Sequence, residues 1–544
     1  MSNQSPLGRL ARYASRISSP VREDTFSRST FVSPDSRPPR KPAPAPAPLR
    51  ALRSGCALAA TLCLAACAVG PDYHKPPQDI PATFKEGADW QRAQANPQGA
   101  LSSTWWLGYN DDTLSHLVDQ SLKANQSIAA SEAAYRVAKA TIDANVASLF
   151  PTIGVDASGT RSRTAAAVST TGQAYTSNLV SASASASWEI DLWGSVRRSI
   201  ESAKASAQAS DAQLAGERLS IAASLAVDYF ALRQADIDID SLKQQQQIDE
   251  KILDMDRAGF QQGTVSNDTL LDDQDNLELV IADLQATETS REQDEHAIAV
   301  LIGEPPASFT LPAQSDYTFA TPAVPLGFPS QLLERRYDVV SAERTAAAAN
   351  AKIGVAEAAF FPTLTLSAQG GFEHNALANL FSMPNRFWTL GPDLAATIFD
   401  GGARTAAVHE AEATYDQQVA TYRGTVLSAF QSVEDSLSSY NHLQQQEQAF
   451  GNIYKRNQQL FSSQQAQMQA GTASQEAVLT QQLTLLQAAQ NLKDTQAALT
   501  ESSVTLVKNL GGGWQWDDAK GAAVSTTANA APQSSNQTSG APSQ

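Results

Sequence analysis

Cys67 is the residue whose type and surroundings point most directly to chemistry in this sequence. It follows the run LAA (64–66), which ends a short apolar stretch with Arg50 and Arg53 just before it. Basic residues, a short apolar stretch and small residues are typical of a secretory signal, and a membrane-spanning helix would need roughly 20 apolar residues. A cysteine at this point fits a lipobox, in which the thiol takes a diacylglyceryl group and cleavage makes the cysteine the new N-terminus. The sequence therefore predicts lipidation of Cys67; an ordinary signal peptide with a coincidental cysteine is the alternative.

The remaining cysteines, Cys56 and Cys63, precede the predicted cleavage point, so the mature chain would keep no pair that could form a disulfide. Ala68, in place of an aspartate, favours sorting to the outer membrane. We therefore predict a leader over 1–66 and a lipid-anchored N-terminal segment over 67–110. Residues 1–49 are basic and rich in proline, which a secretory leader does not need. An over-extended gene start and a genuine disordered extension both explain them.

Side chains that could support catalysis or bind a metal are scattered. No histidine has a partner at the spacing of metal ligands, and no phosphate-binding loop is present. We therefore predict no enzyme activity, no catalytic residue, no metal, and no cofactor besides the lipid on Cys67. The six histidines are His74, His116, His296, His374, His409 and His442.

The charge of the chain argues against nucleic acid as a partner. The net charge is −17, and residues 1–66 carry ten basic and three acidic groups, so the remainder is near −24. A nucleic-acid-binding protein needs a basic surface. The mature sequence contains no apolar run long enough for a spanning helix. Residues 515–544, rich in Ser, Thr, Ala, Asn and Gln, are predicted to be a disordered tail.

The mature chain is internally duplicated. Glycines recur 208 positions apart, and GTVSNDTLLDDQ (263–274) aligns with GTASQEAVLTQQ (471–482). This spacing is far longer than a solenoid repeat, so it indicates a duplicated half-domain. We predict a first repeat over 111–305, a linker over 306–329 and a second repeat over 330–514. The paired glycines are Gly194 with Gly402, Gly216 with Gly424, Gly263 with Gly471, and Gly303 with Gly511.

Each repeat is predicted to contain a leading helix, two strands and two long helices. Phe-Pro pairs end the leading helices, and proline is then absent from segments rich in Ala, Gln, Leu and Glu, which suit helices. The leading helices are expected at 112–149 and 330–359. The strands are expected at 151–165, 178–192, 362–374 and 387–399. The long helices are expected at 196–257, 267–301, 404–463 and 474–509.

The strand segments alternate between apolar and small polar residues. In LVSASASASWEIDL (179–192) the serines share one face with Glu189, and the alanines share the other with Trp188. Such alternation is typical of a barrel wall between lipid and a wet lumen, although a half-buried soluble strand also alternates. Trp188, Trp388 and Phe387 are candidates for an interfacial girdle. Four strands cannot close a barrel, so two or three chains would have to share one.

Three separated motifs follow one another along the mature chain: GPDY (70–73), TWWLGYNDDTLSHLVDQSLKANQSI (104–128) and ERRYDVVSAERTAAAANAKIGVAEAAFFPTL (334–364). Together with the cysteine motif they resemble the outer-membrane factors of tripartite efflux pumps. The resemblance covers most of the mature chain. Within this family, the sequence is most similar to the NodT-type lipoproteins related to TolC. It implies a homotrimer with a 12-stranded outer-membrane barrel continuous with a long periplasmic α-helical barrel. It also implies an inner-membrane RND-type pump and a periplasmic adaptor as partners, and small molecules as cargo. Type I protein secretion and a non-transporting lipid-anchored coiled coil are the alternatives.

Two departures from the family concern functional positions. The usual Arg-Arg-Pro-Asp reads RRYD (335–338), which we expect to change only how that helix begins. Thr480 stands where the family often has an acidic residue of the periplasmic constriction. Asp272, Asp273 or Asp275 is then a candidate for the gate, and the alternative is that these are solvated positions on a coiled coil.

The turns between the long helices are expected at Gly263-Thr264 and Gly471-Thr472. Glycine permits the tight reversal, and the small residues after it would let a partner helix approach closely. The resemblance implies that the adaptor docks at these tips; the alternative is that they are turn residues only.

Overall fold

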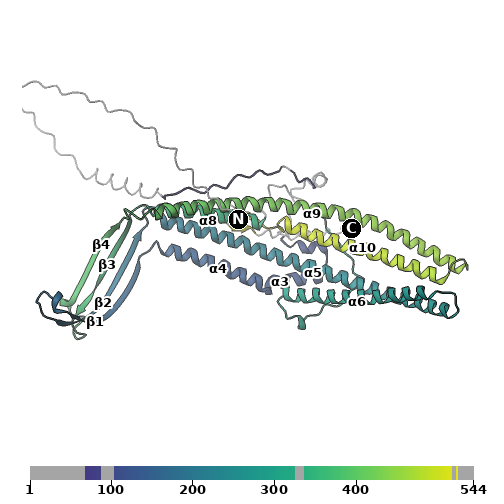
Figure 1. Cartoon of the computed structure of the whole chain (residues 1–544). Helices are drawn as coiled ribbons and strands as arrows, with labels where there is room; N and C mark the ends of the chain where they lie inside the picture. Colours follow the sequence, from purple (N-terminus) through teal and green to yellow (C-terminus); the bar gives the residue numbers. More distant parts are fainter. Residues whose placement is uncertain (1–67, 82, 87–102, 325–335, 518–521, 525–544) are drawn as a thin grey trace, which may run out of the picture. The chain divides into compact units, whose positions relative to one another are not determined.

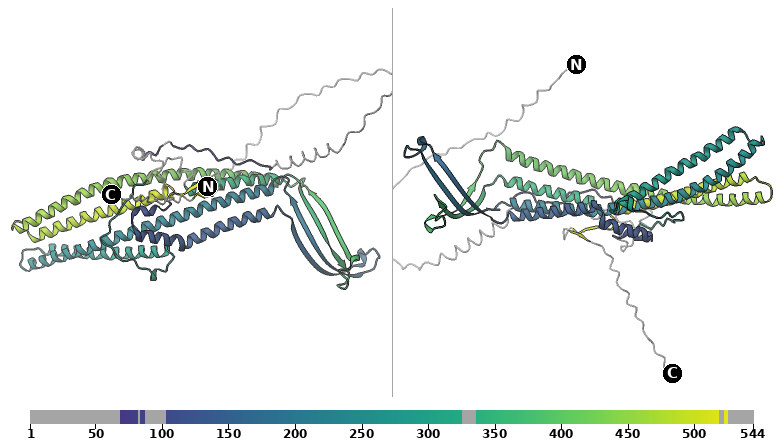
Figure 2. Two further views of the ribbon diagram at one scale, coloured as in Figure 1. Left: turned by 180° about the vertical axis from the view of Figure 1, so that it is seen from behind. Right: turned by 90° about the horizontal axis from the view of Figure 1, so that it is seen from below.

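The computed structural model describes residues 68–81, 83–86, 103–324, 336–517 and 522–524. The predicted leader and the predicted lipidation site Cys67 lie outside these ranges, as does most of the predicted tail. Figures 1 and 2 show four strands lying side by side and long helices packed along one another.

The two repeats have the same order of elements. In the first, α3 (Asp112–Ala124) and α4 (Gln126–Ala147) precede β1 (Thr152–Thr164) and β2 (Tyr175–Ile190), which lead to α5 (Ser195–Gln261) and α6 (Asn267–Leu301). In the second, α8 (Tyr337–Ala358) precedes β3 (Thr363–His374) and β4 (Arg386–Ala395), which lead to α9 (Ala403–Gln469) and α10 (Gln475–Asn509). The long helices α5 and α9 have 67 residues each, and α6 and α10 have 35 each. The equal lengths support the duplication. Short 3₁₀ helices and a second strand pair complete the described elements: η1 (Trp105–Tyr109), η2 (Ala166–Val168), η3 (Pro306–Ser308), η5 (Met383–Asn385), β5 (Gln515–Asp517) and β6 (Ala522–Val524).

Some predicted boundaries differ from the structure. The leading helix expected at 112–149 is two helices, because Asn125 adopts an extended conformation and its side chain caps α4 by accepting hydrogen bonds from Ser127 N and Ile128 N. Helices α5 and α9 run four and six residues beyond their predicted ends at 257 and 463. Strand β2 begins at Tyr175, before the predicted 178, and β4 ends at Ala395, before the predicted 399. The predicted disordered tail begins with the antiparallel pair β5–β6.

The beginnings of the long helices α5 and α9 are alike in both repeats. Gly194 (φ 85°) and Gly402 (φ 94°) have left-handed backbones that favour glycine. Just before them, the carboxylate of Asp191 accepts hydrogen bonds from the backbone of Val196 and Arg197, and that of Asp400 does so from Gly402 and Arg404. The same local device therefore turns each strand pair into its long helix.

The strands form one antiparallel sheet of order β1-β2-β3-β4. Strand β2 of the first repeat pairs with β3 of the second, and Ala186 lies opposite Ala368 at the centre of this pairing. The sheet therefore joins the two repeats, and β1 and β4 are its two edges.

Helix α5 is the central helix and contacts α4, α6, α8 and α10. Its packing against α8 includes Gly216, where a Cβ atom would lie 2.1 Å from the Tyr337 ring. Tyr337, which stands in place of the family's proline, therefore does more than begin α8. Its ring fills a position that only glycine leaves open.

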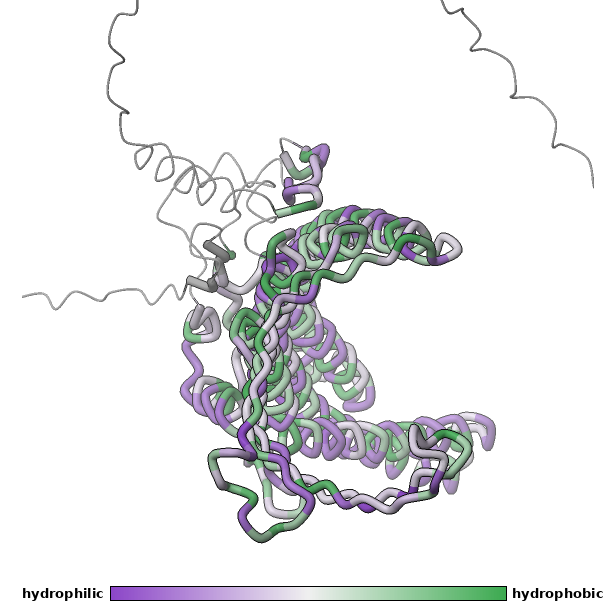
Figure 3. The backbone as a smooth tube through the Cα atoms, turned by 90° about the vertical axis from the view of Figure 1, so that its left-hand side faces the viewer, coloured by the Kyte–Doolittle hydropathy of each residue, from purple (hydrophilic) through white to green (hydrophobic). Residues whose placement is uncertain are grey.

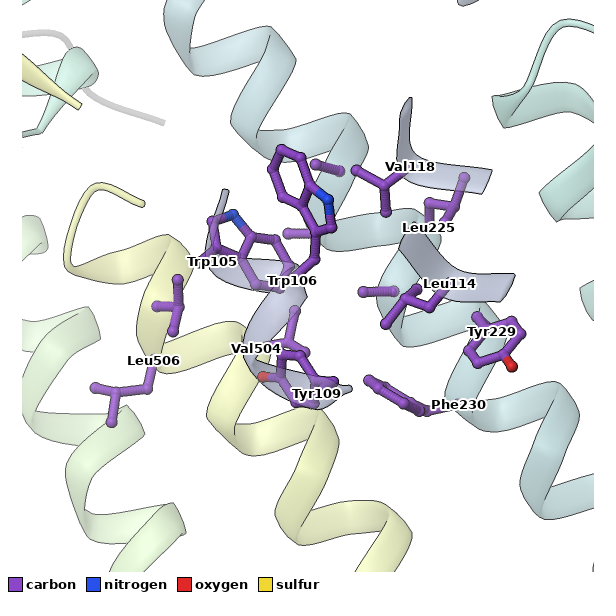
Figure 4. Packing of buried hydrophobic residues seen from close by; sticks show 14 of the residues in the cluster. Trp105, Trp106, Tyr109, Leu114, Val118, Leu225, Tyr229, Phe230, Val504 and Leu506 are labelled. Carbon is purple, nitrogen blue, oxygen red and sulfur yellow. The ribbon is translucent and has the colours of Figure 1, made fainter. Parts of the chain in front are cut away.

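The largest hydrophobic cluster lies where η1, α3, α5 and α10 meet (Figure 4). Trp105 and Trp106 are buried and meet edge to face, with ring centroids 5.8 Å apart. The Tyr109 hydroxyl shares a hydrogen bond of 2.7 Å with Ser503 on α10. This cluster ties the segment before the first repeat to the last helix of the second. No helix in the described ranges is both long and apolar enough to cross a bilayer.

Candidate functional site

The register of the sheet creates two chemically distinct faces. Directly opposed residues of antiparallel strands point to the same side, and successive residues alternate. The four strands lie nearest the viewer in Figure 3. One face, which we call the apolar face, carries Ile153, Val155 and Ala157 of β1, Ala182, Ala184, Ala186, Trp188 and Ile190 of β2, Leu364, Leu366 and Ala368 of β3, and Trp388, Leu390 and Leu394 of β4. The other, the polar face, carries Asp156 and Ser158 of β1, Ser181, Ser183, Ser185, Ser187 and Glu189 of β2, Thr365, Ser367 and Gln369 of β3, and Thr389 and Asp393 of β4.

The predicted alternation of β2 and β3 is thus confirmed, and β1 and β4 extend both faces, with Arg161, Arg163 and Arg386 on the apolar side at the loop ends of the strands. Large side chains of the apolar face are open in the single chain; Val155 is 85% exposed and Trp388 is 72% exposed. A continuous exposed apolar surface of this kind marks a site that contacts lipid or another protein chain. The prediction for Phe387 was wrong, because strict alternation puts it on the polar face, opposite Gly371.

The tips of the two helical hairpins have the same geometry. Gly263 and Gly471 both have φ of 74°. The backbone N and Oγ1 of Thr264 donate to the Gly259 carbonyl at 2.9 and 3.0 Å, and Thr472 repeats both bonds, with equal lengths, to Gln467. The sequence did not reveal that each threonine hydroxyl helps to close its turn. Both threonines are exposed at the tips.

The candidate gate residues fall into two groups. Asp272 and Asp275 are exposed, whereas Asp273 is partly buried. Burial raises the pKa of Asp273 to about 6, and the nearby carboxylates of Asp256, Glu476 and Asp272 act in the same direction. Thr480 donates its hydroxyl to the Glu476 carbonyl at 3.0 Å, within its own helix. The structure therefore brings carboxylates of α5, α6 and α10 together around Asp273.

Two further acidic sites join α10 to the first repeat, and no motif in the sequence indicated either of them. Gln234 donates to both Asp238 of α5 and Asp494 of α10. Burial raises the pKa of Asp494 to about 7, with Asp238 adding to the effect. In the second site, burial raises the pKa of Glu501 to about 7, and Asp294 and Asp228 add to it. The acids of each site lie on different helices and are far apart in sequence, so spacing along the chain could not reveal these groups. Within the described ranges no group of His, Cys, Asp or Glu could hold a metal ion.

The segment 68–73, which follows Cys67, is held against α5 and α8. Arg198, with a side chain only 6% exposed, donates to the carbonyl oxygens of Val69 (3.1 Å) and Gly70 (3.0 Å) and to the carboxylate of Asp72 (3.0 Å). Val69 N in turn donates to the Trp193 carbonyl at 3.0 Å. A Cβ atom on Gly194 would lie 2.8 Å from the Ala68 backbone. The position next to Cys67 is therefore fixed where β2 meets α5.

Further along the segment, Tyr73 donates to Glu343 Oε1 at 2.5 Å, and Asn350 donates to the Pro71 carbonyl at 2.9 Å. We call these contacts and those of Arg198 the N-terminal clamp. The GPDY motif is thus explained by contacts that each of its residues makes with the helices.

The two repeats share one sheet with two different faces, and long paired helices continue from it. This is the architecture of channel subunits of the bacterial cell envelope. The chain belongs to the outer membrane efflux protein family, whose model matches residues 117–304 and 328–512. It is similar to the probable efflux pump outer membrane protein TtgC of Pseudomonas putida KT2440, with 30% identity over 461 residues that cover 83% of this chain and 93% of TtgC. It is also similar to the outer membrane protein OprJ of Pseudomonas aeruginosa, with 29% identity over 84% of this chain and 95% of OprJ.

Solved structures agree with this assignment. The outer-membrane channel OprN matches with a TM-score of 0.74 and 27% identity, over 82% of this chain and 99% of OprN. The Campylobacter jejuni CmeC outer membrane channel has the same fold, with a TM-score of 0.74 and 23% identity over 84% of this chain and 97% of CmeC. The protein is therefore an outer-membrane efflux channel subunit of the TolC-like fold, as its motifs predicted. Its family consists of efflux ducts and not of enzymes.

Proposed function

We propose that three copies of this chain close their sheets into one 12-stranded barrel, which forms the exit duct of a tripartite efflux pump. The sheet is the observation that carries the proposal. It has four strands, two open edges at β1 and β4, and opposite chemistry on its two faces. Open edges are not tolerated in lipid, and an even number of antiparallel strands lets β4 of one copy pair with β1 of the next.

Crosslinking across these edges tests the trimer. Ser158→Cys on β1 and Thr389→Cys on β4 both lie on the polar face, where water keeps the thiols reactive. A flexible bis-maleimide should give covalent species of up to three copies and none larger. Ser185→Cys with Gln369→Cys, which are opposed on β2 and β3 of one chain, is the control and should give no ladder. A ladder that stops at two copies, or no interchain product, would contradict the trimer.

The rest of the proposed pump extends from the other end of the helices. We propose that the exposed tips at Thr264 and Thr472 dock onto a periplasmic adaptor, which connects the duct to an inner-membrane RND-type pump. The proposed gate is formed by the carboxylates around the partly buried Asp273. The exposed Asp272 and Asp275 belong to it. The cargo is small molecules delivered by the pump. The identical geometry of the two tips supports this proposal, because one adaptor surface could recognise both.

Lipidation of Cys67 is the proposed anchor. The N-terminal clamp supports it, since Ala68 is held beside Gly194, at the base of the sheet whose apolar face would meet the membrane. Cys67→Ser should abolish labelling with palmitate and block normal cleavage. Labelling that continues in this variant would contradict the assignment. We expect partial export to survive, because the strands by themselves can hold the barrel in the membrane.

A further inference from the structure

The charges of the four-stranded sheet are sorted by sign between its two faces. Four carboxylates lie on the polar face: Asp156, Glu189, Glu373 and Asp393. The basic residues of these strands are all on the other face: Arg161, Arg163, His374 and Arg386. The assignment follows from the register. Arg386 lies opposite Phe372 and therefore in the row of Ala182 and Ala157, while Arg161 and Arg163 continue the series of Val155 and Ala157.

The basic residues also gather at one end of the strands. Arg161 and Arg163 lie near the end of β1, His374 is the last residue of β3, and Arg386 is the first of β4. All four are at the ends joined by the strand-to-strand loops, far from the helices. These loops, 165–174 and 375–385, contain no charged residue. We call the three arginines the basic rim of the apolar face.

The basic rim has no counter-charge on its own side of the sheet. Arg161, Arg163 and Arg386 are exposed, and no carboxylate of the described residues forms an ion pair with any of them. Three unpaired arginines are thus gathered at one end of the apolar face, in a chain whose net charge is −17. An arginine guanidinium forms paired hydrogen bonds with a phosphate, which makes it suited to that group.

Closure of the barrel would enlarge the site. Arg161 and Arg163 lie on edge strand β1, and Arg386 lies on the opposite edge strand β4. Pairing of β4 with β1 of the next copy would bring arginines of two copies to one seam. The neighbouring copy adds no acid on this face, because all four carboxylates point to the other side. The seam would be completely basic.

We infer that the basic rim binds the phosphorylated headgroup of a lipid in the outer leaflet, with the acyl chains lying on the apolar face below. The inference rests on the proposed function, since the loop ends reach the outer surface only if the helices extend into the periplasm. The partner must carry phosphate and acyl chains together, because Arg386 lies next to Trp388 on the same face of β4, and the Trp388 side chain is 72% exposed. Each arginine at a membrane surface raises the affinity for anionic lipids about fivefold.

Native mass spectrometry of the intact trimer, titrated with lipid A, tests this inference. The variant Arg161→Gln, Arg163→Gln, Arg386→Gln should bind lipid A about 100-fold more weakly than the wild type, at about fivefold for each arginine. The corresponding Arg→Lys variant should keep most of the affinity. Arg136→Gln, Arg423→Gln, Arg456→Gln makes the same change of net charge at exposed positions on the helices and should bind as the wild type does.

Phosphate dependence gives a second measurement. The wild-type trimer should bind dephosphorylated lipid A as weakly as the Gln variant does, and 10 mM inorganic phosphate should not replace the bound lipid. Equal affinity of wild type and Gln variant for lipid A would overturn the inference while leaving the channel function intact. A chain that fails to enter the outer membrane, or that gives no edge crosslinks, would refute the proposed function and the inference with it.

Discussion

Arg291 of α6 donates its Nε to Oδ1 of Asp236 on α5 at 2.7 Å, and the Asp236 side chain is completely buried. The same carboxylate accepts from Arg233 at 3.0 Å and from the backbone N of Gln314 at 2.9 Å. The two arginines donate in turn to the carbonyl oxygens of Leu311 (2.7 Å) and Pro312 (2.8 Å). This network holds the start of the connection between the repeats against the central helix pair.

Removing Asp236 should therefore destabilise the protein strongly. Asp236→Ala leaves two arginines without their shared carboxylate in a buried site, and loss of one partner of a buried ion pair costs about 3–5 kcal/mol. The measurement is the urea midpoint of the helical circular dichroism signal. Asp240→Ala, at an exposed position of the same helix, should change it little. Similar effects of the two substitutions would mean that the network does not stabilise the fold.

The N-terminal clamp makes a second prediction. Arg198→Ala removes the donor of the partly buried carbonyl oxygens of Val69 and Gly70, and the loss of each such hydrogen bond costs about 0.5–1.5 kcal/mol. Segment 68–86 should then open more often, so that trypsin cleaves sooner after Lys85. The rate of cleavage is followed by mass spectrometry. Arg218→Ala, which removes an exposed ion pair with Glu132, is the control. Unchanged cleavage in Arg198→Ala would show that other contacts hold the segment.

The tips are predicted to be required for export but not for assembly of the trimer. Thr264→Arg with Thr472→Arg puts charged side chains on both proposed docking surfaces and removes two hydroxyl bonds to backbone carbonyls. We expect normal amounts of trimer in the outer membrane but loss of export and of crosslinking to the adaptor.

The matched control for the tips is Thr289→Arg with Thr421→Arg. These exposed threonines also donate to a backbone carbonyl, at 2.8 and 3.0 Å, but lie within α6 and α9. The control variant should export normally. Export that persists in the tip variant would exclude the tips as the docking site.

The two faces of the sheet predict opposite tolerance of charge. Ala184 lies opposite Val155 on the apolar face, and Ser185 lies opposite Gly154 with its side chain on the polar face. An arginine facing lipid costs about 2–4 kcal/mol at mid-depth and little in a wet lumen. Ala184→Arg should therefore lower the yield of heat-resistant trimers far more than Ser185→Arg. Equal yields would be incompatible with a lipid-facing apolar face.

The acidic site of Glu501 predicts a pH dependence of stability. Its pKa is raised by burial to about 7, above the usual value of 4.5, so the folded state favours the protonated form. The stabilisation associated with this proton is complete below about pH 4 and is lost as the pH rises through about 7. The thermal midpoint of the wild type should thus fall between pH 5 and pH 8.

Glu501→Gln should make this fall shallower, because the amide keeps the shape of the side chain but does not titrate. The remaining slope would come from Asp494 and Asp273, whose pKa values are also raised by burial, to about 7 and about 6. Glu292→Gln, at an exposed position on α6, should follow the wild type. A slope that is the same in all three proteins would show that Glu501 titrates normally.

The sequence by itself determined the order of the elements and the two faces of β2 and β3, although it did not show the division at Asn125 or the face of Phe387. Duplication was visible in glycines 208 residues apart, and the alternation of serine with alanine in β2 predicted two faces before any partner strand was known. Both signals are local, since a turn glycine depends on its own φ and a strand's alternation depends only on the pleat. The cysteine motif and the efflux family were likewise readable from short stretches.

Only the tertiary structure decided which distant residues meet. The acids beside Glu501, the charges around Asp236 and the contacts of Arg198 with segment 68–73 each join residues that are far apart along the chain. The sorting of acids and arginines onto opposite faces of the sheet likewise required the register of all four strands. Such pairings depend on how helices and strands pack in space, and a one-residue shift of register would move every side chain of a strand to the other face.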